Sequence, residues 1–204
     1  SYAGQAAARL EEMQADRELL SEAYLQRCFV QDDERAQDFR SIDGMEEWAG
    51  RAVELADNNR TRYFLGRFYL EYREDAARCY EHLKLCQERG LDFSWMYFYI
   101  ARCHEEFQQW DEALRYFKLA NEKDPEEQDF GWRVVWRLRW KFIETLQIEY
   151  CREAFSYLKV QNEKFGETPR ELWQGSDMHA RLREYRTALD EIERALERDG
   201  QSRN

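Results

Sequence analysis

Helix-breaking residues are scarce in this sequence, which holds two prolines and nine glycines among its 204 residues. Long helices therefore meet few interruptions. No alternating apolar and polar pattern bounded by turn signals occurs, so the sequence predicts no β-sheet. Hydrophobic residues make up 43% of the chain and aromatic residues 15%, which excludes a disordered chain despite 36% charged residues. The expected fold class is all-α.

Long hydrophobic runs and a positive charge balance are also missing. The longest apolar run, Trp95 to Ala101, is far shorter than the ~20 residues that a membrane span needs. The 31 basic and 42 acidic residues give a net charge of −11, so the surface as a whole repels phosphate backbones and anionic membranes. We therefore expect a protein or peptide partner, and neither nucleic acid nor a membrane.

The five cysteines form an odd-numbered set without the compact spacing of a disulfide framework. This usage predicts reduced thiols, buried in the core, and a cytoplasmic location. Cys79, His82 and Cys86 are spaced i, i+3 and i+7, which would place them on one helix face. A structural zinc site usually takes four ligands and no fourth is identifiable, so we expect no metal.

Signatures of catalysis are absent. The segment "HEEFQ" at 104–108 is similar to the zinc-protease helix H-E-x-x-H, but Gln108 replaces the second histidine. Cys103 precedes His104, and adjacent helical residues point about 100° apart, which separates a nucleophile from its base. No G-x-S-x-G, Walker or G-x-G-x-x-G motif occurs. We expect a protein that is not an enzyme and has no cofactor.

An internal repeat is present instead. An alanine followed four residues later by an aromatic or aliphatic residue recurs along the chain, at Ala76/Tyr80, Ala113/Phe117, Ala154/Leu158 and Ala188/Ile192. The alanines are 37, 41 and 34 residues apart, close to the length of one helix pair. The clearest copy is "WMYFYIARCHEEFQQWDEALRYFKLANEKDP", residues 95–125.

This copy resembles the tetratricopeptide repeat (TPR), whose two antiparallel helices need small residues where they cross. It carries Ala101 and Ala113 at the small positions, with large residues beside them. The resemblance is clear over residues 93–126 and degenerate elsewhere. Gly66 holds the first-helix small position in the preceding copy, whereas Phe142 stands there in the following one. The resemblance implies stacked antiparallel helix pairs in a right-handed solenoid.

The predicted organisation is a single helical domain over residues 1–204. Residues 1–58 form an N-terminal helical segment, with a long amphipathic helix over 3–29 and an acidic linker, "VQDDERAQDFRSIDG". The repeat core covers 59–166, with helical hairpins at roughly 60–90, 93–124 and 128–166. A further helix pair is expected over 167–200.

The stretch "FGWRVVWRLRWKF", residues 130–142, alternates tryptophans with basic side chains. On a helical wheel Arg133, Arg137 and Lys141 share one solvated sector, and the tryptophans fall mainly in a broad apolar arc. Most of the stripe is therefore core packing. Arg139 lies inside the apolar arc, where it either forms a buried ion pair or lines an open groove.

The TPR resemblance implies that the first helix of each pair lines a concave surface, on which stacked repeats align equivalent side chains. The family's carboxylate-clamp branch uses lysine and asparagine at the positions of Tyr63 and Arg67. Because this chain has neither residue there, we do not expect it to bind the ligand of that branch. The register predicts a groove of partly exposed aromatic and basic side chains, at Arg60, Tyr63, Arg67, Trp95, Phe98, Arg102, Trp136 and Arg139.

Such a groove suits a peptide or helix with acidic and apolar residues, because arginine forms bidentate contacts with carboxylates. The expected function is a non-enzymatic scaffold or adaptor that binds other proteins. The alternative is a secretion or assembly chaperone for a protein client.

Overall fold

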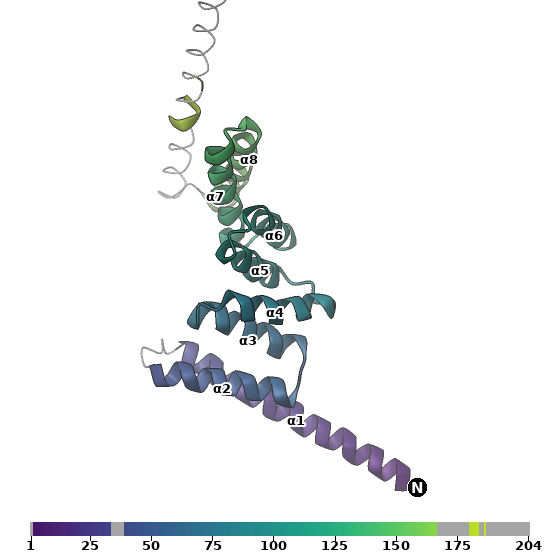
Figure 1. The fold of residues 1–204 in the computed structure, drawn as a ribbon. Helices are drawn as coiled ribbons and strands as arrows, with labels where there is room; N and C mark the ends of the chain where they lie inside the picture. Colours follow the sequence, from purple (N-terminus) through teal and green to yellow (C-terminus); the bar gives the residue numbers. More distant parts are fainter. Residues whose placement is uncertain (1, 34–38, 167–179, 184–185, 187–204) are drawn as a thin grey trace, which may run out of the picture. The chain divides into compact units, whose positions relative to one another are not determined.

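The computed structural model describes residues 2–33, 39–166, 180–183 and 186, and these residues contain no strand. Eight helices carry labels in Figure 1. Their bounds are α1 Tyr2–Asp33, α2 Phe39–Leu55, α3 Asn59–Tyr72, α4 Ala76–Glu88, α5 Ser94–Glu106, α6 Trp110–Lys123, α7 Gln128–Thr145 and α8 Ile148–Phe165. The all-α repeat architecture is therefore confirmed. None of the described helices is long and apolar enough to cross a membrane.

The chain divides into two compact units, Ser1–Ala113 and Leu114–Asn204. The division falls within helix α6 and not in a linker. In repeat proteins each repeat contacts only its neighbours, so a compact unit does not have to end where a helix ends. Whether the whole chain forms the single domain expected from the sequence stays a prediction, as does the helix pair over 167–200, which falls mostly outside the described residues.

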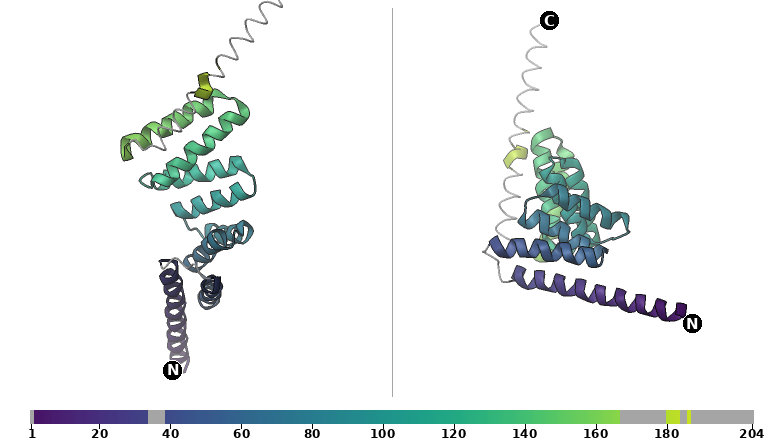
Figure 2. Two further views of the ribbon diagram at one scale, coloured as in Figure 1. Left: turned by 90° about the vertical axis from the view of Figure 1, so that its left-hand side faces the viewer. Right: turned by 60° about the horizontal axis from the view of Figure 1, so that its bottom comes forward.

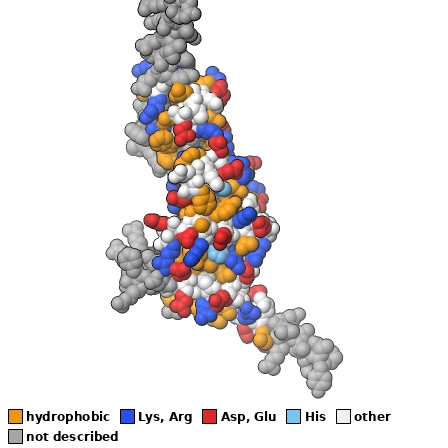
Figure 3. All heavy atoms as spheres, in the orientation of Figure 1, with side chains coloured by type: hydrophobic (Ala, Val, Ile, Leu, Met, Phe, Trp, Pro, Cys, Tyr) orange, Lys and Arg blue, Asp and Glu red, His pale blue; other side chains and the backbone are white. Residues whose placement is uncertain are grey.

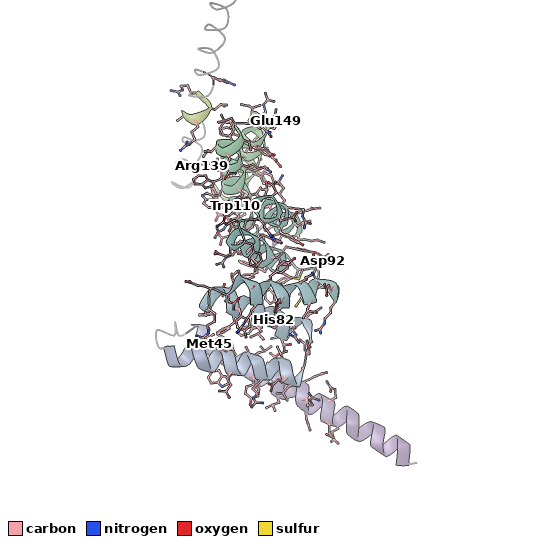
Figure 4. The ribbon with its side chains drawn as sticks, in the orientation of Figure 1. Met45, His82, Asp92, Trp110, Arg139 and Glu149 are labelled. Carbon is pink, nitrogen blue, oxygen red and sulfur yellow. The ribbon has the colours of Figure 1, made fainter. Side chains whose placement is uncertain are left out.

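The N-terminal segment is a pair of antiparallel helices, α1 and α2, which lie side by side (Figure 2). The prediction of a linker over 30–44 is wrong for most of its length, since α1 continues to Asp33 and α2 begins at Phe39. High charge does not itself end a helix, and no proline or glycine stands in this segment before Gly44. Met45 of α2, labelled in Figure 4, joins Leu25 and Cys28 of α1 in a buried cluster.

Each of the three later turns between paired helices contains one non-glycine residue in the left-handed region. These residues are Glu74 after α3, Gln108 after α5 and Leu146 after α7, with φ of 53°, 59° and 57°. A left-handed residue is a common way to end a helix, because it lets the following amide bond back to the last turn. The recurrence at matching places is backbone evidence for the repeat.

Helix α3 begins with a reciprocal cap. The Asn58 side chain accepts a hydrogen bond from the amide of Thr61 at 3.0 Å, and the Thr61 hydroxyl accepts one from the amide of Asn58 at 3.2 Å. Two donors of the first turn are thereby satisfied. Asn58 therefore fixes the start of α3.

The small positions predicted from the repeat are buried. Ala101 is 0% exposed in the first unit, and so is Ala154 in the second. A Cβ on Gly66 would lie 3.2 Å from the carbonyl oxygen of Cys79 on α4, so α3 and α4 approach each other closely there. The Ala188/Ile192 copy lies outside the described residues.

Candidate functional site

Helices α3 and α5 are neighbours in the first unit and share one surface. We call it the α3–α5 face and define it by three residues of α3 and three of α5, namely Tyr63, Arg67 and Glu71 with Trp95, Tyr99 and Arg102. Tyr63 and Arg67 are four residues apart, as are Arg67 and Glu71, so one stripe of α3 presents all three. The face therefore has an aromatic end at the helix N-termini and a charged end at the helix C-termini.

An interlocked set of polar groups crosses the middle of the face. Arg67 Nε donates to Glu71 Oε2 at 2.7 Å, and the Tyr99 hydroxyl donates to the other oxygen of the same carboxylate. Both carboxylate oxygens are thus occupied, and the Glu71 side chain is only 23% exposed. Burial, and then the bond to Glu71, raise the pKa of Tyr99, so this phenol stays protonated. The set holds α3 and α5 in a fixed relation.

The aromatic end is built from rings that meet edge to face. The Tyr63 ring centroid lies 5.5 Å from that of Phe93 and 6.1 Å from that of Tyr99. Trp95 approaches Phe98 at 5.3 Å. Phe93 is 40% exposed, and Tyr63 and Trp95 are half-buried, so part of this aromatic area reaches solvent. Rigid rings of this kind offer contact area at little cost in side-chain entropy.

Two residues predicted for the groove do not have the expected exposure or place in the first unit. Phe98 is only 6% exposed, because its ring packs against Trp95 and Tyr99 of its own helix. Arg60 is exposed, but its guanidinium is engaged in an ion pair with Glu22 of α1 at 2.8 Å. The expectation of a partly exposed Phe98 is wrong.

A cavity of about 370 Å³ opens at the charged end of the face. It is lined by Leu70, Glu71, Glu74, Arg102 and Glu106. Arg102 also stacks on its own helix, with its guanidinium carbon 5.8 Å from the centroid of the Tyr99 ring. Of the residues predicted for the groove, Arg102 alone lines this cavity, which contains more carboxylates than guanidinium groups. The predicted groove itself stays a prediction.

The remaining predicted groove residues belong to the second unit. Trp136 is half-buried and lies 6.1 Å from Trp140, ring centroid to ring centroid. Arg139 on α7 is 6% exposed, with its guanidinium carbon 5.6 Å from the Trp140 ring centroid (Figure 4). The open-groove alternative for Arg139 is therefore wrong, because a buried guanidinium offers no free surface. A concavity shared by both units stays a prediction.

Sequence reasoning missed Glu71, Glu74 and Glu106. The notable signal for Glu71 was its place four residues after Arg67, the i, i+4 spacing at which helical ion pairs form. Nothing in the sequence marks Glu74, since its place at the cavity depends on the left-handed turn after α3. Charged side chains of both signs are interspersed with hydrophobic ones over the described surface in Figure 3, so composition alone does not reveal a local patch.

The candidate zinc ligands do not come together. Cys79 and Cys86 are fully buried, whereas His82 stacks on the ring of Tyr69, with centroids 5.7 Å apart, and its Nδ1 lies 3.1 Å from Arg62 Nη1 (His82 is labelled in Figure 4). Burial lowers the pKa of His82 and raises the pKa of Cys86 to about 11. Over the described residues, no group of histidine, cysteine and carboxylate side chains could hold a metal ion.

Comparison with solved structures gives the same fold. YrrB, described as a TPR protein with an unusual peptide-binding site, matches with a TM-score of 0.62 and 14% identity over 85% of this chain and 84% of that one. A MamA protein matches with a TM-score of 0.64 and 12% identity over 87% and 91% of the two chains. PilW, a type IV pilus biogenesis factor, matches with a TM-score of 0.60 and 16% identity over 91% of this chain and 83% of that one.

No protein-family model and no curated protein sequence matches the chain. At 12–16% identity the structural likeness carries information about fold and not about activity. Together with the buried small positions and the recurring left-handed turns, it answers the question of architecture. The chain has the all-α fold of tetratricopeptide repeat proteins.

Proposed function

We propose that the chain is a non-enzymatic interaction module whose α3–α5 face binds an extended or helical segment of a protein partner. The observation that carries the proposal is the combination of a cavity with partly exposed aromatic rings on one surface of the first unit. Aromatic and arginine side chains beside a concavity are the residue types that most often dominate protein interfaces.

The internal bonding of the face supports the proposal. Glu71, Arg67 and Tyr99 hold one another, so the side chains need little reordering when a partner arrives. A preorganised surface loses less entropy on binding and keeps more of its contact energy. The peptide-binding site described for YrrB is a property of that protein, and its likeness to this chain adds a precedent within the fold.

A selection of random peptides displayed against the whole 204-residue chain tests the proposal. We expect enrichment of a peptide family whose binding requires Tyr63 and Trp95. Removing an aromatic anchor from an interface typically costs ~2 kcal/mol or more, so Tyr63→Ala or Trp95→Ala weakens binding at least tenfold. Dissociation constants are measured by fluorescence anisotropy, and circular dichroism checks that both variants keep their helicity.

Trp140→Ala is the control, since Trp140 is an exposed aromatic residue, at 40%, outside the α3–α5 face. It leaves the affinity unchanged if the face is the binding site. Equal losses in Trp140→Ala and Trp95→Ala would refute the proposed location. The absence of any enriched peptide would refute the peptide-binding function.

A further inference from the structure

The cavity at the charged end of the α3–α5 face has the size of a side-chain pocket. Its volume of about 370 Å³ is near the lower end of the ~300–1,000 Å³ range of ligand pockets, so it fits one long side chain better than a folded surface. Buried Leu70 supplies an apolar wall. A long side chain with an apolar stem and a charged tip matches such a lining.

The charges around this cavity are predominantly negative. Glu71, Glu74 and Glu106 carry −3 and Arg102 carries +1, which gives −2 for the lining. If Glu71 is set aside because Arg67 already neutralises it, the remaining lining is still negative, at −1. Within the described part of the chain, Glu74 and Glu106 make no ion pair.

The backbone adds to this negative potential. Glu71 is the penultimate residue of α3 and Glu106 is the last residue of α5, so the cavity lies at the C-terminal ends of two helices. Helix C-termini present unpaired carbonyl oxygens and carry a partial negative charge that favours cations. Helix ends and side chains therefore act in the same direction.

We propose that this cavity binds a lysine or arginine side chain of the partner segment, while the aromatic end of the face binds apolar residues beside it. The proposal rests on the proposed function of the α3–α5 face and specifies the partner's chemistry. The long basic side chain extends along Leu70 and donates to the carboxylates of Glu74 and Glu106. Arg102 remains stacked on Tyr99 at the edge of the pocket.

This pocket selects against the acidic segment that the sequence predicts for the groove. An incoming carboxylate would meet one guanidinium and at least two carboxylates, and like charges at close range oppose binding. Arg67, a predicted anion ligand on α3, already bonds to Glu71. A metal ion is also a poor occupant, because no metal-holding group occurs among the described residues.

The test repeats the peptide selection on the whole chain and on the Glu74→Gln/Glu106→Gln variant. We expect lysine or arginine at one fixed position of the peptides enriched on the original chain, and loss of that preference on the variant. For one enriched peptide, replacing the basic residue with glutamine weakens binding about tenfold on the original chain, because hydrogen bonds to charged groups are the stronger ones. On the variant the same replacement changes affinity less than threefold.

Glu81→Gln/Glu88→Gln is the matched control, with two exposed glutamates of α4 that do not line the cavity. It keeps the preference for a basic residue. Peptides that depend on Tyr63 and Trp95 but show no basic preference would overturn the pocket and leave the proposed function standing. So would a preference for an acidic residue that depends on Arg102. Failure to enrich any peptide would overturn both.

Discussion

The α3–α4 pair of the first unit and the α7–α8 pair of the second solve the same packing problem in different ways. In α3–α4 the helices meet at Gly66, where a Cβ would lie 3.2 Å from a backbone oxygen of α4. In α7–α8 the corresponding position is Phe142, which is 1% exposed and could not stand at so close a crossing. The close approach occurs instead at Gly131, where a Cβ would lie 2.0 Å from Gln161 Nε2.

The position that requires glycine thus differs between the two pairs by more than two helical turns. The group that it contacts differs as well. At Gly66 the neighbouring atom is fixed backbone, whereas at Gly131 it is the end of a long side chain. Gln161 is 1% exposed and its Oε1 has no hydrogen-bond partner among the described residues. The second crossing therefore depends on a buried amide with unmet bonding capacity, and we expect it to be the weaker of the two.

The largest effect is expected from Gly66→Leu. The new side chain would collide with the Cys79 carbonyl and with Leu83, and the backbone cannot yield without separating α3 from α4. We expect a loss of about 3 kcal/mol in local stability. Hydrogen exchange followed by mass spectrometry reports the helices separately. Amides of α3 and α4 should lose protection while those of α7 and α8 keep it.

Gly50→Ala on α2 serves as the control for this change, because a Cβ at Gly50 meets nothing within 4 Å. Alanine has the higher helix propensity, so this variant gains ~0.5–1 kcal/mol. If Gly66→Leu left the protection of α3 and α4 intact, the crossing at Gly66 would not hold in solution.

In the second pair, Gly131→Ala is expected to cost ~1–2 kcal/mol by forcing the Gln161 amide out of its place. Combining it with Gln161→Ala removes the collision, so the two losses should not add. A double-mutant cycle on α7 and α8 protection measures the coupling, which we expect to be about 1 kcal/mol. Additive losses would mean that the glycine and the amide do not share one space.

The two pairs show which parts of the fold the sequence could predict. The alanine repeat and the scarcity of breakers predicted the helix pairs because small residues and helix propensity act locally. The shift from Gly66 to Gly131 could not be foreseen, since it depends on how α7 and α8 lie against each other in space. The same holds for the site, where Tyr63, Arg67, Trp95 and Arg102 were named but the hydrogen bonds from Arg67 and Tyr99 to Glu71 were not.

A smaller effect is expected at the turn of the second pair. Leu146 holds a left-handed conformation with φ of 57° and is 51% exposed. Leu146→Gly removes the ~1–2 kcal/mol cost of holding a leucine in the left-handed conformation, but it also raises the conformational entropy of the unfolded chain. We therefore expect a net gain of about 0.5 kcal/mol in α7–α8 protection. Thr145→Gly, one residue earlier and still helical, should lower protection instead. A loss of protection in both variants would show that the left-handed conformation of Leu146 is not strained.

The smallest effect concerns charge at the open end of each pair. Asp57, before α3, accepts bonds from Arg62 at 2.6 and 2.8 Å and from Arg89 after α4 at 2.7 Å. The Glu126 carboxylate, before α7, accepts a bond from one described residue, Lys164 of α8, at 2.6 Å, and its side chain is 75% exposed. The first pair therefore gains more from its carboxylate than the second, and acid should affect the first pair more.

The direction of this effect follows from the pKa of Asp57, which hydrogen bonds from Arg62 and then Arg89 hold well below its ordinary value of 3.8. A carboxyl group with a lowered folded pKa stabilises the fold fully above that ordinary value and loses the contribution as pH falls further. The Asp57 side chain is 40% exposed, so screening keeps the contribution below about 1 kcal/mol. Asp57→Asn should reduce α3–α4 protection at pH 7 and 5, and its difference from the original chain should shrink at pH 3. An unchanged difference at pH 3 would show that Asp57 acts through its shape and not its charge.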